Sequence, residues 1–546
     1  MKIVVAEKIS SSAVEILRED KQWKVVTPEQ LDGRLPAEIA DADALIVRSA
    51  VQADAALLEH AQKLRVIGRA GVGVDNVDLE AATRHGIAVM NTPGANAVAV
   101  AEHTLGMALA MARHLCRADA LMHAGKWEKK TLQGTELRGK TLGIVGLGRI
   151  GIEVARRARA FGMKLLAHDP FVTPEAVRQA EIELTSLDKV LAAADYLTLH
   201  LALTPQSAEM INAETIKKMK KGARLINCAR GELLNEAAVA DALKSGHLAG
   251  AAVDVFTEEP PKNSPLLTAP NVILTPHIGG STHEAQEAVG VQIAIQVREF
   301  LRRGVMQNAV NVPSVSDAEY AELQPYMTLA ERLGSFIAQA SEAGLEEIGL
   351  QYSGPIAGGK TQFVRNAALV GVLNSVLAEK ANLVNASAVA EERGVRVRET
   401  AKQKPSSGSA GSVITVSLKT HEREHEVKGA VLHETSPRLL SVDGIDVEAP
   451  LERNLVYLRN RDVPGVIGKI GTILGENKIN IANFSLGRAE NATSAAGASA
   501  SRAPEGHGTG GEAVCVVHVD SRVPDTVLQK LRGVPAIKIA RAIRLE

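Results

Sequence analysis

Cysteine is scarce in this 546-residue chain, and that scarcity narrows the possible classes of protein. The three cysteines, Cys116, Cys228 and Cys515, lie far apart and form neither a CxxC pair nor the spacing of a zinc site. A disulfide framework is therefore excluded, and we expect no metal ion. Few, dispersed thiols are typical of a reducing compartment, so we expect a cytoplasmic protein.

An excess of charge and a long apolar run are also missing. The chain has 62 lysine and arginine residues against 63 aspartate and glutamate residues, a formal net charge of −1. No basic surplus is available to drive binding to nucleic acid or to an anionic membrane, so neither partner is expected. No apolar run reaches the length of a membrane span, and the opening MKIVVAEKIS leads directly into an expected strand rather than a signal peptide.

What the sequence does contain is a repeated alternation of short β-rich runs with amphipathic stretches. Over residues 1–94, strands are predicted at MKIVVAE, WKVVT, ALIVRS, LRVIGRA and IAVMNTP. A second series starts at TLGIVG and continues to VILTPH. This βαβ pattern predicts parallel sheets covered by helices. A largely apolar helix is expected over 95–118 between the two series, and an amphipathic helix over 284–303 after them.

The pattern changes after residue 312, where an α+β domain is expected over 313–450. Its expected elements are two helices, two strands and one loop, over 316–342, 362–380, 413–420, 425–433 and 403–412. Residues 452–546 follow the order strand, helix, strand, strand, helix, strand, the βαββαβ arrangement of a ferredoxin-like domain. An insert rich in alanine, glycine and serine, 489–511, separates its second and third strands and is expected to be a flexible loop.

The stretch GIVGLGRIG contains the spacing GxGxxG, with Gly146, Gly148 and Gly151 between an expected strand and an expected helix. Such glycines let the backbone approach a pyrophosphate, and the following helix start supplies N–H groups. Asp169 stands 18 residues beyond Gly151, at the end of the strand KLLAHD, where an acid accepts ribose hydroxyls and repels a 2′-phosphate. The segment predicts binding of NAD rather than NADP. The alternative is a tight strand–helix turn without a ligand.

Four further polar residues, Arg230, Asp254, Glu259 and His277, each stand at or just past an expected strand end. The carboxyl ends of parallel strands share one edge of a sheet, so these side chains are expected to face one cleft. Removing a hydride from a secondary alcohol requires a base for the hydroxyl proton, which His277 suits, with Glu259 to orient it. Arg230 can hold a substrate carboxylate in a bidentate contact.

The motifs that carry these residues, NCARGELLN, AAVDVFTEEPP and TPHIGG, together with the glycine loop, resemble those of the D-isomer-specific 2-hydroxyacid dehydrogenases. The resemblance covers about residues 1–310 and implies two Rossmann-like α/β lobes with a cleft between them. It implies that Arg230, Glu259 and His277 are catalytic and that Asp254 holds the nicotinamide carboxamide. The sequence departs from the family pattern at Glu232 and Asn235, which flank the arginine loop. The implied cofactor contacts are Gly146, Gly148, Arg149, Ile150, Gly151, Asp169, Cys228, Ala229, Asp254 and His277.

The first lobe carries two arginines at strand ends, Arg48 and Arg69, which indicate a substrate with a second anionic group. The segment RAGVGVDNVDLEAA resembles the members of that family that oxidise 3-phosphoglycerate. By that resemblance, Lys129 reaches the substrate from a neighbouring subunit. The implied substrate contacts are Arg48, Ser49, Arg69, Asn96, Lys129 and Arg230.

Residues 452–546 resemble the ACT regulatory module, through the loop NRDVPG at 460–465 and Asn480. Such modules bind an amino acid between paired subunits, which implies an effector site at Asp462, Gly465 and Asn480. The preceding region resembles, by position, the intervening domain of the phosphoglycerate-oxidising members.

Together these features predict NAD-dependent oxidation of 3-phospho-D-glycerate to 3-phosphohydroxypyruvate, the first step of L-serine synthesis, with possible feedback by L-serine. The alternatives are a related dehydrogenase of the glycerate, hydroxypyruvate or 2-hydroxyglutarate type, or an NAD-sensing binding protein on the same core. A homodimer or homotetramer is expected. The expected domains are a substrate lobe, an NAD lobe, an intervening domain and an ACT domain, over 1–94 with 284–312, 95–283, 313–450 and 452–546.

Overall fold

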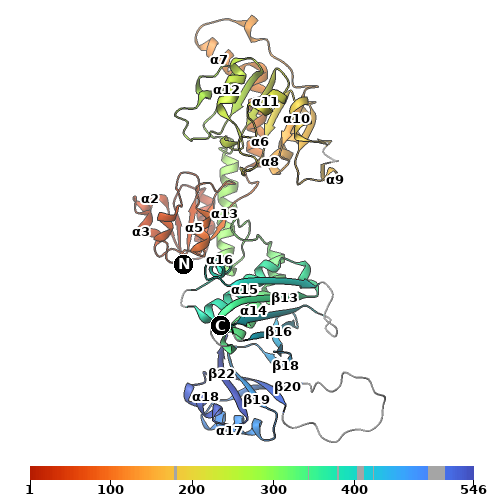
Figure 1. Ribbon diagram of the computed structural model, residues 1–546. Coiled ribbons are helices and arrows are strands. Elements are labelled where there is room, and N and C mark those ends of the chain that lie inside the picture. Colours follow the sequence, from red (N-terminus) through yellow and green to blue (C-terminus); the bar gives the residue numbers. More distant parts are fainter. Residues whose placement is uncertain are drawn as a thin grey trace, which may run out of the picture.

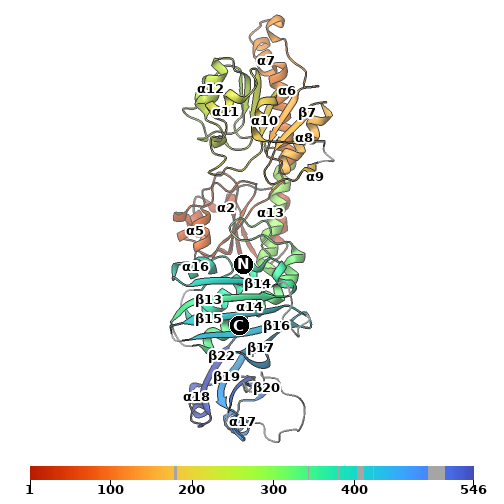
Figure 2. The same cartoon turned by 45° about the vertical axis from the view of Figure 1, so that its right-hand side comes forward.

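Four sheets lie one after another along an elongated molecule (Figures 1 and 2). The computed structural model describes residues 1–177, 181–341, 344–377, 380–402, 411–421, 423–489 and 511–545. Most of the expected loop at 403–412 and of the insert at 489–511 lies outside these ranges. None of the helices that the structure describes is long and apolar enough to cross a membrane. The predicted fold class, two α/β lobes followed by an α+β domain and a ferredoxin-like domain, is confirmed.

The first lobe holds a parallel five-stranded sheet in the order β2-β1-β3-β4-β5. Its strands are β1 (Lys2–Val5), β2 (Lys24–Val26), β3 (Ala44–Val47), β4 (Val66–Arg69) and β5 (Ala88–Met90). Its helices are α1 (Ser11–Arg18), α2 (Pro28–Leu31), α3 (Leu35–Ile39), α4 (Ala55–Glu59) and α5 (Leu79–Arg84). All four residues of β3 are buried, as expected of a parallel strand covered on both faces.

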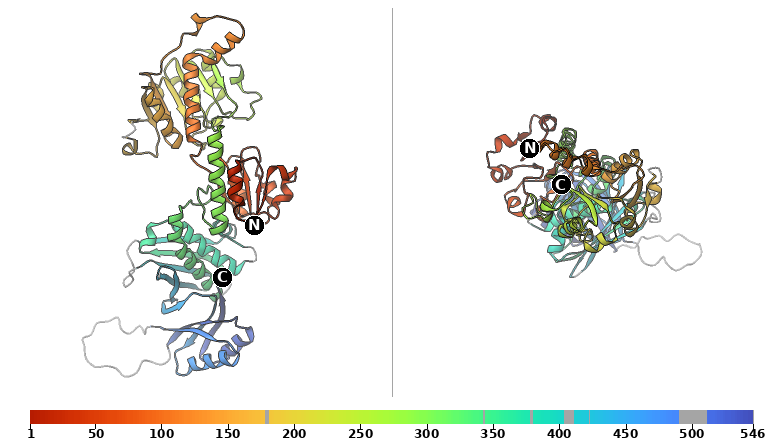
Figure 3. Two further views of the ribbon diagram at one scale, coloured as in Figure 1. Left: turned by 180° about the vertical axis from the view of Figure 1, so that it is seen from behind. Right: turned by 90° about the horizontal axis from the view of Figure 1, so that it is seen from above.

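One long helix, α13 (His283–Arg303), ties the far end of the second lobe back to the first. It packs against α1 and β4, and Figure 3 shows it running lengthwise beside the first sheet. A Cβ at Gly68 in β4 would lie 2.8 Å from the Ile293 side chain, so glycine there permits the close approach. The residues after the nucleotide lobe thus complete the core of the first lobe.

The second lobe is a parallel seven-stranded sheet in the order β12-β11-β10-β9-β6-β7-β8. Its strands are β6 (Thr141–Val145), β7 (Lys164–His168), β8 (Glu183–Leu184), β9 (Tyr196–Leu199), β10 (Ala223–Asn227), β11 (Leu248–Val253) and β12 (Val272–Leu274). Its α-helices are α6 (Ala97–Arg113), α7 (Leu115–His123), α8 (Arg149–Ala160), α9 (Pro174–Val177), α10 (Leu187–Ala193), α11 (Ala213–Lys218) and α12 (Glu236–Lys244). Its short 3₁₀ turns are η1 (Lys129–Leu132), η3 (Gly231–Leu233) and η4 (Pro265–Thr268).

The helix predicted over 95–118 is two helices, because His114 adopts a left-handed conformation with φ 53° between α6 and α7. Ten residues of α6 are buried, as its apolar sequence predicts, whereas α7 buries none. The left-handed residue therefore ends the buried helix and turns α7 outward to the extremity of the lobe (Figure 1).

The third domain packs α14 (Asp317–Ala340) and α15 (Thr361–Val376) on a six-stranded sheet in the order β14-β13-β15-β16-β17-β18. Its remaining elements are β13 (Leu345–Ser353), η5 (Pro355–Gly358), α16 (Ala386–Glu392), β14 (Arg396–Lys402), β15 (Val413–Thr420), β16 (Glu424–Leu432), β17 (Ser436–Val442) and β18 (Ile445–Pro450). The strands predicted near 413–420 and 425–433 correspond to β15 and β16, while the other four strands were not predicted. The helix predicted to reach residue 380 ends at Val376.

The fourth domain is an antiparallel four-stranded sheet in the order β20-β21-β19-β22, covered by two helices. Its elements are β19 (Asn454–Arg461), α17 (Val466–Glu476), β20 (Ile481–Arg488), β21 (Glu512–Val519), α18 (Asp525–Arg532) and β22 (Ile537–Arg544). This is the predicted βαββαβ order.

The crossing of α14 and α15 generates a stability prediction. A Cβ at Gly371 in α15 would lie 2.0 Å from the Glu331 carbonyl oxygen, so Gly371→Ala must push the helices apart. We expect a loss of about 1–3 kcal/mol in the stability of the third domain, measured by hydrogen exchange of α14 and α15. Gly358→Ala is the control, because nothing lies within 4 Å of a Cβ there. Equal protection in both variants would contradict the close packing.

Candidate active site

The glycine loop joins β6 to α8 at the carboxyl edge of the second sheet. Gly146 has φ 96°, and a Cβ there would lie 2.3 Å from the His200 carbonyl oxygen. A Cβ at Gly151 would lie 2.1 Å from the Gly146 carbonyl oxygen, so these two glycines allow the tight strand–helix turn. A Cβ at Gly148 would have no neighbour within 4 Å, so the space at the start of α8 is open. An open approach to helix N–H groups fits a dinucleotide pyrophosphate.

Asp169 follows β7 at the same edge and contacts this loop directly. Its two carboxylate oxygens accept the backbone N–H groups of Leu147 and Phe171, each at 2.8 Å. The acid therefore holds the glycine loop in place, and its contact with a ribose remains a prediction. Together with the glycines, this donor and acceptor set fits NAD.

The arginine loop follows β10. Arg230 immediately precedes η3, and its Nη2 lies 3.1 Å from the Asp75 carboxylate of the first lobe. A Cβ at Gly231 would lie 2.0 Å from the Phe256 carbonyl carbon, so glycine lets this turn pack against the end of β11. Asn235, one of the departures from the family pattern, caps α12 by accepting the Ala238 N–H at 2.9 Å. The change therefore leaves the capping function of that position intact.

His277 and Glu259 form a hydrogen-bonded pair in the loops that follow β12 and β11. His277 Nδ1 lies 2.6 Å from Glu259 Oε2, and the other oxygen of Glu259 accepts the Phe256 N–H at 3.0 Å. The hydrogen bond from Glu259 raises the pKa of His277 above its ordinary value, against the effect of burial. Burial opposes ionisation of Glu259, but the His277 and Phe256 hydrogen bonds outweigh it and lower its pKa. Because Nδ1 is engaged, Nε2 is the nitrogen free to exchange a proton with a ligand.

The loop that carries His277 is organised by a buried carboxylate. Asp254 is 1% exposed, and its oxygens accept the Ile278 N–H at 2.9 Å, the Gly279 N–H at 2.8 Å and the Thr275 hydroxyl. His277 itself has φ 52°, and its N–H donates to the Asp254 carbonyl at 2.8 Å. His103 Nε2, from α6, lies 3.2 Å from the Thr275 hydroxyl. Asp254 therefore fixes the loop, and its predicted contact with a carboxamide remains a prediction.

Arg69 of the first lobe lies close enough to Arg48 of the same lobe and to Arg230 of the second lobe for their charges to interact. Burial lowers the pKa of Arg69, and the nearby charge of Arg230 lowers it further. Arg69 Nε is buried and has no partner among the described residues. Arg48 stands on a loop held by Glu7, whose carboxylate accepts the Arg48 and Val51 N–H groups at 2.8 and 3.0 Å. A concentrated, incompletely paired positive charge of this kind is stabilised by an anion.

These groups meet in a cleft of about 640 Å³ between the two lobes. Most of the predicted substrate and catalytic residues line it: Arg48, Ser49, Arg69, Asn96, Glu259 and His277. Arg230 reaches the cleft through its ion pair with Asp75, which also lines it. Lys129 lies apart from it, exposed in η1 beyond α7. Asp75 and Glu7 were missed, although each follows a strand of the first lobe at the same edge as the arginines.

The predicted cofactor contact Cys228 has surroundings that limit its chemistry. Cys228 is buried beside Met107, and burial raises the pKa of its thiol to about 12, so it stays protonated. Cys228 and Ala229 both lie in the loop after β10, and their contacts with the cofactor remain predictions.

The predicted effector residues of the fourth domain are divided between two places. Asp462 and Gly465 line a pocket at the start of α17, where Arg488 pairs with Asp462 at 3.1 Å. Asn480 follows the far end of α17, and its amide donates to Asp520 at 2.6 Å. One chain therefore does not bring the three residues together.

Comparison with known proteins gives the class that this geometry defines. Residues 105–279 match the family model for the NAD-binding domain of D-isomer specific 2-hydroxyacid dehydrogenases. Residues 322–443 match the D-3-phosphoglycerate dehydrogenase intervening domain, and residues 455–536 match the ACT domain. A solved structure of NAD-dependent formate dehydrogenase from Staphylococcus aureus in complex with NAD is 29% identical, with a TM-score of 0.51 over 58% of this chain and all of that chain. The second lobe is an NAD-binding domain of this class.

Relatives along the full length give the particular family. The D-3-phosphoglycerate dehydrogenase of Methanocaldococcus jannaschii is 40% identical over the whole of both chains. The protein of the same name from Bacillus subtilis is 38% identical over all of this chain and 99% of its own. The chain belongs to the D-3-phosphoglycerate dehydrogenase family.

The double role of Asp169 yields a prediction for cofactor binding. We expect Asp169→Ala to weaken NADH binding by roughly 10- to 100-fold, because it removes the predicted ribose acceptor together with the observed support of the glycine loop. Fluorescence titration of NADH measures the dissociation constant. Glu183→Ala, in the neighbouring strand β8, is the control. An unchanged affinity in Asp169→Ala would contradict the proposed contact.

Proposed function

We propose that this protein oxidises 3-phospho-D-glycerate to 3-phosphohydroxypyruvate with NAD, as the first step of L-serine synthesis. The observation that carries the proposal is the cleft, which combines the His277–Glu259 pair with a cluster of arginines on the opposite lobe. The full-length relatives and the intervening and ACT domains support the same substrate. The glycerate and hydroxypyruvate alternatives leave two of the three arginines without a ligand.

The charges of the cleft match the two anionic ends of this substrate. Arg230 holds the carboxylate, after exchanging its ion pair with Asp75 for the substrate. Arg48 and Arg69, with the Asn96 amide, hold the phosphate, and Arg69 Nε gains the acceptor that it lacks in the described structure. The C2 hydroxyl then lies between Arg230 and His277.

The proton and the hydride leave C2 separately. NAD, when bound in the second lobe, accepts the hydride. Neutral His277 takes the hydroxyl proton at Nε2, and the Glu259 carboxylate at Nδ1 stabilises the imidazolium that forms. Arg230 stabilises the developing carbonyl oxygen by its positive charge. In the reverse direction the imidazolium returns the proton.

The assembly and its control are part of the same proposal. Lys129 completes the phosphate site from a neighbouring subunit, since it lies outside the cleft of its own chain. L-Serine binds between paired ACT domains, with Asp462 and Gly465 from one copy and Asn480 from the other, because one chain separates them. The active form is then a homodimer or homotetramer, and we place it in the cytoplasm.

The pKa of His277 gives a directional test. Oxidation needs neutral His277, so its rate falls as the pH drops below that pKa, while reduction needs the imidazolium and falls as the pH rises above it. Glu259→Gln removes the carboxylate that raises the pKa. In this variant the fall of kcat/KM for oxidation at low pH and its fall for reduction at high pH should therefore both move to lower pH. NADH absorbance, followed across a range of pH, measures both rates.

The control for this experiment is His277→Ala. Its rate should fall about 10²–10⁴-fold and should no longer depend on pH in this range, while NADH binding is retained. A pH profile of Glu259→Gln that is unchanged, or that is displaced to higher pH, would contradict the assigned pair.

Substrate recognition is tested by Arg69→Gln. We expect kcat/KM for 3-phosphohydroxypyruvate to fall roughly 10- to 100-fold, because a charged contact to the phosphate is lost. The value for unphosphorylated hydroxypyruvate should stay within a few-fold. Arg65→Gln, which directly precedes β4 and lies outside the cleft, is the matched control. Equal losses for both acids would mean that Arg69 serves the structure and not the phosphate.

A further inference from the structure

One buried side chain, that of Asn76, joins the two loops of the first lobe that carry Arg48 and Arg69. Asn76 lies in the loop that follows β4, lines the cleft and is 9% exposed. Its amide Nδ2 donates to the Arg48 carbonyl at 3.0 Å and to the Val51 carbonyl at 2.7 Å. Both hydrogens of this nitrogen are therefore used within the protein, so Asn76 acts on its neighbours and not by donating to a ligand.

The backbone beside Asn76 makes a second connection between the same loops. The Ala53 N–H donates to the Asn76 carbonyl at 2.8 Å, and the Asp78 N–H donates to the Ala53 carbonyl at 3.0 Å. Ala53 and Val77 form a short parallel bridge. These backbone bonds remain when the Asn76 side chain is shortened, so its amide can be removed without separating the loops altogether.

The loop after β3 is held from its other side by Glu7, which follows β1. The Glu7 carboxylate accepts the N–H groups of Arg48, Ala50 and Val51 at 2.8, 3.1 and 3.0 Å. The sheet order places β3 between β1 and β4. Glu7 therefore takes the N–H groups of this loop from one neighbouring strand, while Asn76 takes its carbonyls from the other.

The Arg69 guanidinium lies against the loop that Asn76 belongs to. Gly71 has φ 152°, and a Cβ there would collide with that guanidinium, so glycine lets the group lie over its own loop. Burial lowers the pKa of Arg69, and the nearby charges of Arg230 and Arg48 lower it further. Arg48 and Arg69 thus repel each other, and bonds between their loops oppose that repulsion when no anion lies between them.

We propose that Asn76 is a positioning residue, which sets the spacing of Arg48 and Arg69 so that both contact the phosphate of the substrate. The inference rests on the proposed function, because it takes that phosphate as the ligand of the two arginines. An amide suits the position, since an ionised carboxylate could not donate to the two carbonyls. Groups that are already in place lose less freedom on binding, so the amide strengthens phosphate binding and leaves the His277–Glu259 pair unaffected.

Steady-state kinetics of Asn76→Ala tests this role. We expect KM for 3-phosphohydroxypyruvate to rise about tenfold while kcat stays within about threefold, because phosphate binding is impaired and proton transfer is not. The value of kcat/KM for hydroxypyruvate, which has no phosphate, should stay within about threefold. Asn76→Asp, which keeps the shape of the side chain but cannot donate when ionised, is the second variant and should raise KM at least as much. An unchanged KM for the phosphorylated acid, or equal losses for both acids, would overturn the proposal.

A double-mutant cycle with Arg48→Gln shows whether the amide acts through Arg48. Asn76→Ala should raise KM by less than about twofold in the Arg48→Gln background, because the arginine that the amide positions is already lost. A further rise of about tenfold would show that the amide acts independently and would overturn the proposal. Arg48→Gln alone separates this inference from the proposed function. An unchanged KM there overturns both, whereas a raised KM there with an unchanged KM in Asn76→Ala overturns the role of Asn76 alone.

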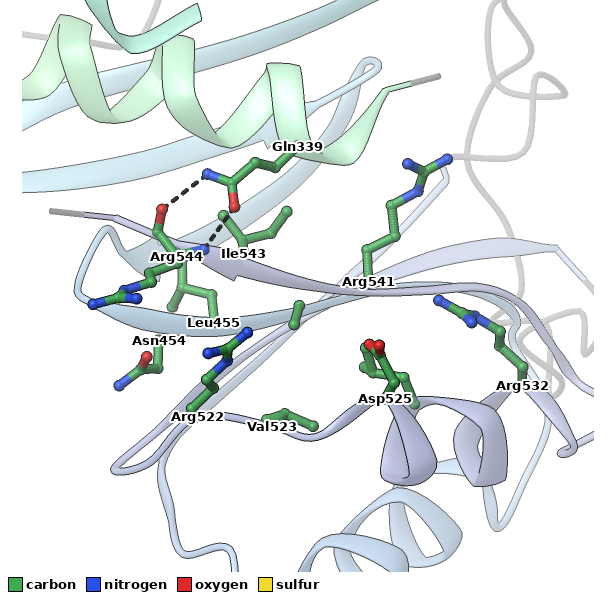
Figure 4. Close-up of a pocket in the computed structure, with 12 residues that line it drawn as sticks. Gln339, Asn454, Leu455, Arg522, Val523, Asp525, Arg532, Arg541, Ile543 and Arg544 are labelled. Carbon is green, nitrogen blue, oxygen red and sulfur yellow. Dashed lines mark hydrogen bonds between the residues drawn. The ribbon is translucent and has the colours of Figure 1, made fainter. Parts of the chain in front are cut away.

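Two other amides provide matched controls, because each holds backbone outside the cleft. The Asn311 Nδ2 donates to the Ile87 carbonyl at 2.9 Å, just before β5 begins. The Gln339 side chain bonds the Arg544 backbone twice, accepting its N–H at 2.9 Å and donating to its carbonyl at 2.8 Å (Figure 4). Asn311→Ala and Gln339→Ala should lower the melting temperature, as Asn76→Ala does, but keep the KM of the parent. A rise in KM in both controls equal to that in Asn76→Ala would overturn the proposal, since the effect would then follow from lost stability.

Discussion

The buried carboxylate of Asp254 is the interaction on which the catalytic side of the cleft depends. Removing a charge from water is costly unless hydrogen bonds replace the lost hydration, and Asp254 accepts three of them from the segment Thr275–Gly279. His103 and those bonds lower the pKa of Asp254 despite its burial, so it stays charged. They also hold His277 in a left-handed conformation that an isolated chain would avoid. The distance from His277 to Glu259 follows from this anchored loop.

The opposite side of the cleft depends on a constraint of another kind. The first lobe is completed by α13, which comes from beyond the nucleotide lobe, so the chain crosses the cleft twice. Arg48 and Arg69 therefore belong to a different body from His277. Among the described residues, the ion pair between Asp75 and Arg230 connects the two bodies. In the proposed binding mode a substrate with two anionic groups contacts both bodies, which links recognition to the relative position of the lobes.

Much of this could be predicted from sequence because its signals are local. The glycine loop, Asp169 and the strand-end residues Arg230, Glu259 and His277 each depend on a strand that ends nearby in the chain, and the period of the apolar residues marks those strands. The missed strands β13, β14, β17 and β18 have signals that are not local. The seven residues of β14 are all exposed, so no burial pattern marks them, and their pairing with β13 joins residues 49 apart.

The site residues that sequence reasoning missed depend on long-range contacts in the same way. Asp75 is meaningful only because Arg230 lies opposite it, and Glu7 only because the loop after β3 folds over it. The helix break at His114 could not be seen from an apolar run that continues through it. Asn480 and Asp462 look like one site in the sequence because a family motif joins them, whereas a single chain holds them at opposite ends of α17.

The central claim is that Arg48 and Arg69 on one side of the cleft bind a phosphate group, while His277 on the other side transfers a proton. The most direct test is the rate of NADH oxidation by the unaltered protein with 3-phosphohydroxypyruvate, beside hydroxypyruvate and 2-oxoglutarate, each with and without L-serine. The account predicts a preference for the phosphorylated acid of at least about 100-fold in kcat/KM, since two arginines contact a group that the other acids lack. A comparable rate with either unphosphorylated acid would contradict it and leave the cofactor site and the His277–Glu259 pair standing, and a comparable rate with hydroxypyruvate would also leave Arg48 and Arg69 without a ligand.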